Sequence, residues 1–322
     1  MIPLNKEPFA PSVQYGFVRA RQLEGTYPGD GKTGTWPITA NRILWGWGAP
    51  PEKSWPYDTR RWPPTEPKGI DDLAHEHLGR RYQRARSLNE CKLVLAFHSP
   101  IVGVSISITK SWYDPPKGII PATRSGKSHD HFISLVGYED SEQRLIFKNS
   151  WGSKWGDGGL GYLSYRTFQR DWREGWFSYI GPMPPSTEPT AKLTVRQWGA
   201  KEFGGGVFHA YEIVGPGEDR MAWAFAIQRI GSLEVEELFV KPQHRKKGFG
   251  RQLVGLLAEL AFRVQQYPRI WVSYVDATAI NIAVLEKLLH PLGLHLREAP
   301  VRWAPFVFCG SKDGLVSASL HL

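Results

Sequence analysis

Residues 131–152 read HFISLVGYEDSEQRLIFKNSWG, which places a histidine at the start of this stretch and an asparagine after the apolar run at 145–148. Catalysis by a cysteine–histidine pair needs an imidazole on a rigid strand, together with an amide that accepts the ring N–H and so fixes the tautomer. His131 and Asn149 suit these two roles. The stretch therefore predicts one half of a nucleophilic catalytic site.

Asn149 is followed by Trp151-Gly152 and then by Trp155-Gly156-Asp157-Gly158-Gly159. Together with His131, this spaced pattern resembles the His and Asn half of the papain-type cysteine proteases. Upstream, residues 15–21, 30–31 and 49–57 (APPEKSWPY) resemble the left-hand domain of bacterial members. The resemblance covers about residues 12–180. It implies an α+β papain-like domain in which Trp151 shields the His–Asn hydrogen bond from water.

The position of the nucleophile departs from this pattern. In the family the reactive cysteine lies roughly 130–150 residues upstream of the His and Asn, which would put it at or before residue 1. The chain's two cysteines are Cys91 and Cys309, and Cys91, in ECKLVLAF before an expected strand at 94–108, is predicted to be structural. The resemblance also begins after the oxyanion-hole glutamine. We therefore expect residues 1–180 to form an N-terminally truncated, inactive domain in which His131 and Asn149 are remnants.

Two alternatives stay open. The start codon is misplaced and the protein is a cysteine peptidase, or the surface left by the missing helix is covered by a second chain or by the C-terminal domain of this chain. Each large apolar side chain stranded in water costs about 1.5–3 kcal/mol, so such a surface would need a cover.

Helical patterns in this first domain are clearest at 12–23, 39–47 and 70–78, and strand patterns at 94–108 and 145–148.

A proline-rich stretch, GPMPPSTEPTA at 181–191, predicts an extended linker. It divides residues 1–180 from a second domain at 192–322. Strand patterns follow at 193–198, 207–214, 221–230 and 233–240, then a helix at 249–264, a strand at 270–274, a helix at 281–289 and a strand pair within 295–309.

The sequence RKKGFGR at 245–251 lies between the last of those four strands and the helix at 249–264. Backbone N–H groups of a turn that enters a helix N-terminus point at an anion, and glycine permits its close approach. The pattern resembles the [R/Q]-x-x-G-x-[G/A] loop of the GNAT N-acetyltransferases, and the later strand and helix come in the order of that family. The resemblance implies a mixed α/β GNAT fold with acetyl-CoA as cosubstrate. It assigns to CoA binding the residues Phe239, Val240, Arg245, Lys246, Lys247, Gly248, Phe249, Gly250, Arg251 and Asn281.

Direct acetyl transfer requires a base that takes a proton from the acceptor ammonium. Glu236 and Glu237 are the candidates, because strand alternation puts one of them on the face opposite its neighbour. The alternative is that both are solvent-facing charges. Family members often carry a tyrosine as general acid where this chain has Leu288. His290 could substitute, or it is a helix-end residue favoured by the local dipole.

Only GAKEFGGG separates Trp198 from Val207, where most GNAT proteins have two helices that wall the acceptor site. The acceptor pocket is therefore expected to be open or supplied from elsewhere, with the papain-like cleft as the obvious neighbour.

The net charge of +9 favours anionic partners, and a CoA pyrophosphate would suffice. The sequence contains no nucleic-acid motif. The two cysteines fit neither a disulfide framework nor a zinc site, so we expect no bound metal. Since no leader or membrane span is evident, we expect a cytoplasmic protein. The sequence predicts an acetyl-CoA-dependent N-acetyltransferase acting on an amine, and the expected source of this amine is a peptide or protein presented by the papain-like domain. The alternatives are a truncated or mis-started cysteine peptidase with an accessory GNAT domain, and a non-catalytic binding scaffold.

Overall fold

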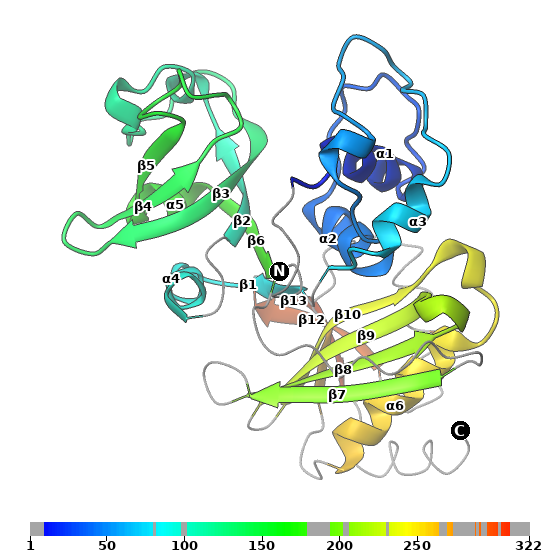
Figure 1. The fold of residues 1–322 in the computed structure, drawn as a ribbon. Coiled ribbons are helices and arrows are strands. Elements are labelled where there is room, and N and C mark those ends of the chain that lie inside the picture. The colour runs from blue at the N-terminus through cyan, green and yellow to red at the C-terminus, as the bar shows by residue number, and fades with distance from the viewer. Residues whose placement is uncertain are drawn as a thin grey trace. The chain divides into compact units, whose positions relative to one another are not determined.

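The computed structural model describes residues 10–79, 82–97, 102–178, 194–201, 206–229, 232–263, 269–272, 287, 290, 295–301 and 304–309. The chain divides into two compact units, residues 1–183 and 184–322 (Figure 1). The predicted linker at 181–191 lies outside the described residues.

The first unit begins with three helices, α1 (Val13–Leu23), α2 (Pro37–Gly46) and α3 (Ile70–His75). All three were predicted from their apolar periodicity. Ser12 sets the start of α1, because its hydroxyl accepts a hydrogen bond from Tyr15 N at 3.0 Å. A short 3-10 helix, η1 (Glu52–Ser54), follows α2. The helices share a core formed by Tyr15, Val18, Ala20, Ile43, Trp55, Ile70 and Ala74.

The rest of this unit is a six-stranded antiparallel sheet in the order β1-β6-β2-β3-β4-β5. Its long central hairpin, β3 to β4, carries His131 and leads directly into Asn149. The strands are β1 (Tyr82–Ala85), β2 (Val102–Ile108), β3 (His129–Glu139), β4 (Arg144–Lys148), β5 (Leu160–Ser164) and β6 (Trp172–Ser178), with α5 (Tyr165–Asp171), η2 (Lys110–Trp112) and η3 (Pro116–Gly118) in the connections.

One expectation for this unit was wrong. Residues 94–97 belong to a helix, α4 (Leu88–Phe97), and of the strand expected at 94–108 the described residues show β2. Ser87 Oγ accepts a hydrogen bond from Glu90 N at 3.1 Å, and Glu90 Oε2 accepts one from Arg86 N at 2.7 Å. This reciprocal arrangement resembles a capping box, which favours helix initiation at this point. Cys91 therefore lies inside a helix.

The second unit contains a seven-stranded sheet in the order β12-β13-β11-β10-β9-β8-β7. Only the β10–β11 pair is parallel within the described residues. Helix α6 packs on one face of strands β8 to β10 and buries Leu253, Val254 and Leu257 there (Figure 1). The elements are β7 (Thr194–Lys201), β8 (Val207–Val214), η4 (Pro216–Glu218), β9 (Arg220–Arg229), β10 (Ser232–Val240), η5 (Pro242–His244), α6 (Phe249–Arg263), β11 (Arg269–Val272), β12 (His295–Val301) and β13 (Ala304–Cys309).

These strands and α6 agree with the predicted elements. Of the predicted helix at 281–289, only Lys287 lies within the described residues. Lys201 pairs directly with Val207, so β7 and β8 form a hairpin. The connection is too short to hold a pair of helices. None of the helices in the described ranges has the length and hydrophobicity to cross a membrane, and the longest, α6, has 15 residues.

Candidate functional site

In the first unit, the β3–β4 hairpin brings His131 and Asn149 together. His131 lies in β3, Asn149 directly follows β4, and Ser134 pairs with Lys148 in the register between them. His131 Nε2 is 2.9 Å from Asn149 Oδ1, which also accepts a hydrogen bond from Ser150 N at 2.8 Å. With that oxygen as acceptor, Nε2 carries the ring proton and Nδ1 is left as the basic nitrogen.

Aromatic rings enclose this pair. The Trp151 ring lies against His131 with centroids 4.8 Å apart, and Tyr113 stacks on Trp151 at 5.2 Å. The ring of Trp155 meets the ring of Trp151 edge-on, with centroids 5.6 Å apart. Trp155 Nε1 donates a hydrogen bond to Trp112 O at 2.8 Å, which fixes the position of the Trp155 ring. Trp151 thus occupies the shielding position that the sequence predicted.

Burial lowers the pKa of His131. The hydrogen bond to Asn149 acts in the opposite direction, and the nearby His129 lowers the pKa further. The net effect favours the neutral imidazole, which is the form that can accept a proton.

The structure does not bring a cysteine to this imidazole within the described part of the first unit. Cys91 is fully buried in α4, in the same core cluster as Val94 and Val104. Burial, assisted by the negative charge of Glu90, raises the pKa of the Cys91 thiol to about 12. The expected structural role fits these observations. Cys309 lies on β13 of the second unit.

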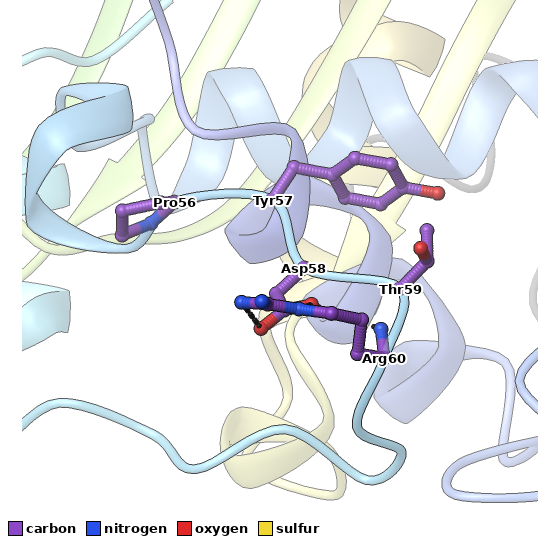
Figure 2. Close-up of a pocket in the computed structure, with 5 residues that line it drawn as sticks. All are labelled: Pro56, Tyr57, Asp58, Thr59 and Arg60. Atoms are coloured by element: carbon purple, nitrogen blue, oxygen red, sulfur yellow. Dashed lines mark hydrogen bonds and ion pairs between the residues drawn. The ribbon is translucent and has the colours of Figure 1, made fainter.

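A shallow hollow elsewhere in the first unit is lined by five consecutive residues, 56–60 (Figure 2). Figure 2 shows the Arg60 guanidinium lying against the Asp58 carboxylate, with Arg60 Nε 2.9 Å from Asp58 Oδ1. Hydrogen bonds from Arg60 lower the pKa of Asp58 to about 2. The two charges neutralise each other, so this hollow is a weak candidate for a binding site.

In the second unit, strand β10 contains a β-bulge. Val235 pairs with Ala226 and Glu237 with the next residue, Phe225, so Glu236 is the extra residue. The bulge shifts the phase of the strand: Leu233 and Val235 pack on the α6 side, as do Leu238 and Val240 three and five residues beyond Val235.

This phase shift corrects the interpretation of the two candidate bases. The side chains of β10 do not alternate strictly between the two faces of the sheet across the bulge. Glu237 lies on the face opposite α6, together with Glu234 and Phe239. Both candidates are buried, Glu236 at 5% and Glu237 at 3% exposure, so the solvent-facing alternative does not hold. Glu237 Oε1 accepts a hydrogen bond from Leu238 N at 3.1 Å.

Sequence reasoning did not single out Glu234. It lies on the same face as Glu237, is 6% exposed, and accepts a hydrogen bond from Arg229 Nε at 2.9 Å. Its alternation with Val235 in SLEVEELFV was visible in the sequence, but its relation to Glu237 depends on the bulge.

The loop after β10 forms the predicted turn into a helix. Lys246 and Gly248 both have positive φ, 62° and 86°, and α6 starts at Phe249. Arg245 Nε donates to Val240 O at 3.3 Å. The side chains of Arg245, Lys246, Lys247 and Arg251 are exposed, whereas Phe249 and Gly250 are partly buried.

The remaining predicted residues are placed as follows. The main chain of Phe239 and Val240 pairs with β9, while the described pairing of β10 with β11 ends at Val235. Asn281 and Leu288 lie outside the described residues, and His290 is exposed.

Comparison with known protein families agrees with both halves of this description. Residues 23–172 match the papain family of cysteine proteases, and residues 166–290 match the acetyltransferase (GNAT) family. The chain carries a papain-like domain followed by a GNAT-like domain. No curated protein sequence matches it significantly.

Solved structures similar to this chain fall into the same two classes. Xylellain, a cysteine protease from Xylella fastidiosa, is 25% identical, with a TM-score of 0.47 over 54% of this chain and 71% of that one. Procathepsin L 3 from Tenebrio molitor is 17% identical, with a TM-score of 0.41 over 54% and 57%. A chimeric spermidine N-acetyltransferase built in part from the Vibrio cholerae enzyme is 13% identical, with a TM-score of 0.27 over 34% and 69%. The chain thus spans between 57% and 71% of these proteins.

Proposed function

We propose that this protein is an acetyl-CoA-dependent N-acetyltransferase that modifies an amine, and that a peptide or protein segment held by the papain-like domain supplies this amine. The match of residues 166–290 to the GNAT family supports the transferase activity. The observation that carries the proposal is the turn at 245–248, which leads from β10 into the 15-residue helix α6.

The residues of this turn fit a CoA pyrophosphate. The N-terminus of α6 offers unpaired backbone N–H groups and a favourable dipole to an anion. Four exposed cationic side chains surround it, those of Arg245, Lys246, Lys247 and Arg251. Acetyl-CoA, when bound there, would supply the activated acetyl thioester.

The face of β10 away from α6 would provide the base. Glu237 is held there by the Leu238 N–H, and a carboxylate in this position can take the proton of an acceptor ammonium as the amine attacks. We assign this role to Glu237, one of the two candidates that the sequence indicates, and note that Glu234 on the same face is hydrogen-bonded to Arg229.

One observation favours a second candidate function, peptide hydrolysis. His131, Asn149 and Trp151 have the geometry of a prepared catalytic imidazole. That activity also needs an ionisable thiol beside Nδ1, and the buried Cys91 does not meet this requirement. We therefore propose that the papain-like domain binds peptide without cleaving it.

The test is the thermal stability of the full chain with and without acetyl-CoA. A ligand that binds only the native state at a hundredfold excess over its Kd stabilises it by about 2.7 kcal/mol. At roughly 2–4 °C per kcal/mol for a domain of this size, we expect the melting temperature to rise by roughly 5–10 °C.

The variant Gly250→Glu should abolish this rise, because it places bulk and negative charge against the pyrophosphate. The matched control is Gly34→Glu in the papain-like domain, where an added Cβ meets open space, and its rise should equal that of the wild type. Wild-type protein whose melting does not respond to millimolar acetyl-CoA would sink the transferase proposal and leave the binding scaffold.

A further inference from the structure

The turn between β8 and β9 contacts the segment that precedes the cationic loop. Asp219 lies in this turn, directly before β9. Its Oδ1 is 2.7 Å from Lys241 Nζ, and its Oδ2 is 3.0 Å from His244 Nε2. One carboxylate thus holds two basic side chains, both of which lie between the end of β10 and residue 245.

These side chains are turned inward. The side chain of Lys241 is 4% exposed and that of His244 is 13% exposed. Burying an ammonium is costly unless a counter-charge is hydrogen-bonded to it. Burial alone would raise the pKa of Asp219, but the hydrogen bond and charge of Lys241, followed by those of His244, bring the net shift downward. The carboxylate is therefore ionised at neutral pH.

Both anchored residues precede the loop, and the ring of His244 also approaches the residue that follows it. Lys241 N donates to Met221 O at 3.0 Å, and His244 N donates to Lys241 O at 2.9 Å, so the segment is also tied through its backbone. The His244 ring lies 6.4 Å from the ring of Phe249, the first residue of α6. Residues 245–248, with their two positive φ angles, span the gap between these anchors.

The basic side chains of residues 241–251 therefore fall into two groups. Lys241 and His244 point to Asp219, whereas Arg245, Lys246, Lys247 and Arg251 remain exposed. In the first group the Lys241 ammonium is paired with a carboxylate inside the protein, whereas the second group leaves its charge available to an anion.

We propose that Asp219 is a positioning residue for acetyl-CoA: by holding Lys241 and His244 it orders the loop at 245–248 before the ligand arrives. This inference rests on the proposed function. A loop that is already ordered loses little conformational freedom when the ligand binds. Asp219 should therefore raise the affinity for acetyl-CoA and leave the rate of the chemical step unchanged.

The experiment compares full-length Asp219→Ala with wild type. We expect the KM and Kd for acetyl-CoA to rise about tenfold, the effect of a loss of about 1.4 kcal/mol, with kcat changed less than twofold. Asp219→Asn should restore part of the affinity, because its amide can still accept from Lys241 and donate to His244. Glu218→Gln, which removes a charge from the same turn but keeps both Asp219 contacts, should bind as the wild type does.

A second readout needs no ligand. Trypsin cuts after Arg245, Lys246 and Lys247 only when the loop opens, so Asp219→Ala should be nicked there at least several-fold faster than wild type. If Asp219→Ala does not fold because Lys241 loses its counter-charge, His244→Ala removes only the second contact and carries the same expectations.

Unchanged affinity and unchanged cleavage in a variant with a lower melting temperature would show that Asp219 is merely structural, which overturns the inference. If wild-type protein binds no acetyl-CoA, the proposed function fails, and the cleavage rates decide by themselves whether Asp219 orders the loop.

Discussion

At the scale of single residues, His131 is held in one orientation, and its surroundings favour the neutral ring. Asn149 Oδ1 fixes the ring through Nε2, Trp151 covers it, and burial lowers its pKa. These features prepare Nδ1 to accept a proton. The sequence predicted the pair because the two residue types and their spacing within one hairpin are characteristic. It could not predict the state of a thiol whose surroundings come from distant strands.

We predict that Cys91 does not react as a protease nucleophile. With a pKa raised to about 12 by burial, only about one thiol in 10⁴ is ionised at pH 8, and reactivity follows the thiolate. Iodoacetamide or an epoxide protease inhibitor should leave Cys91 unmodified in native protein and label it fully in denaturant, as measured by peptide mass mapping. Raising the pH should increase labelling because ionisation rises toward the pKa.

His131→Ala is the matched variant for this labelling. This substitution should not change the rate at which Cys91 is labelled if the two side chains are independent. Stoichiometric modification of Cys91 in native protein that is lost in His131→Ala would instead establish a catalytic pair.

At the scale of secondary structure, the strand β10 shows what a sequence pattern can and cannot reveal. Its bounds were predicted closely, because SLEVEELFV is bounded by turn residues. The bulge at Glu236 was not predicted, because the extra residue is visible only in the pairing of β10 with β9. The error at α4 has a different cause, because the apolar run at 93–97 fits a strand and a helix equally well. The S-x-x-E pattern at residues 87–90 is the signal that favours the helix.

The bulge leads to a prediction about the base. Glu237→Gln should slow acetyl transfer to an amine by about 10²–10⁴-fold, because the amide cannot take the ammonium proton, while the acetyl-CoA melting shift is kept. Glu236→Gln and Glu234→Gln are the matched variants on the same strand and should retain most of the activity. Steady-state rates at saturating acetyl-CoA give the comparison. A large loss in Glu236→Gln with little loss in Glu237→Gln would transfer the role to the bulged residue.

At the scale of the whole molecule, each unit has its own apolar core. Leu135 and Phe147 are fully buried in the core of the papain-like sheet, and Leu253 is fully buried between α6 and the GNAT-like sheet. The change in composition at 181–191 predicted a division of the chain, because a proline-rich stretch with little apolar character cannot join either core.

Separate cores predict separate unfolding. Domains that each bury a core of their own unfold as cooperative units, so calorimetry of the full chain should show two transitions. Acetyl-CoA should raise one of them and leave the other in place. Leu135→Ala and Leu253→Ala form a matched pair, each costing about 2–5 kcal/mol by opening a cavity. Leu135→Ala should lower the transition that ignores acetyl-CoA, and Leu253→Ala the one that responds. A single transition that moves as a whole with ligand and with both variants would show instead that the two domains unfold together.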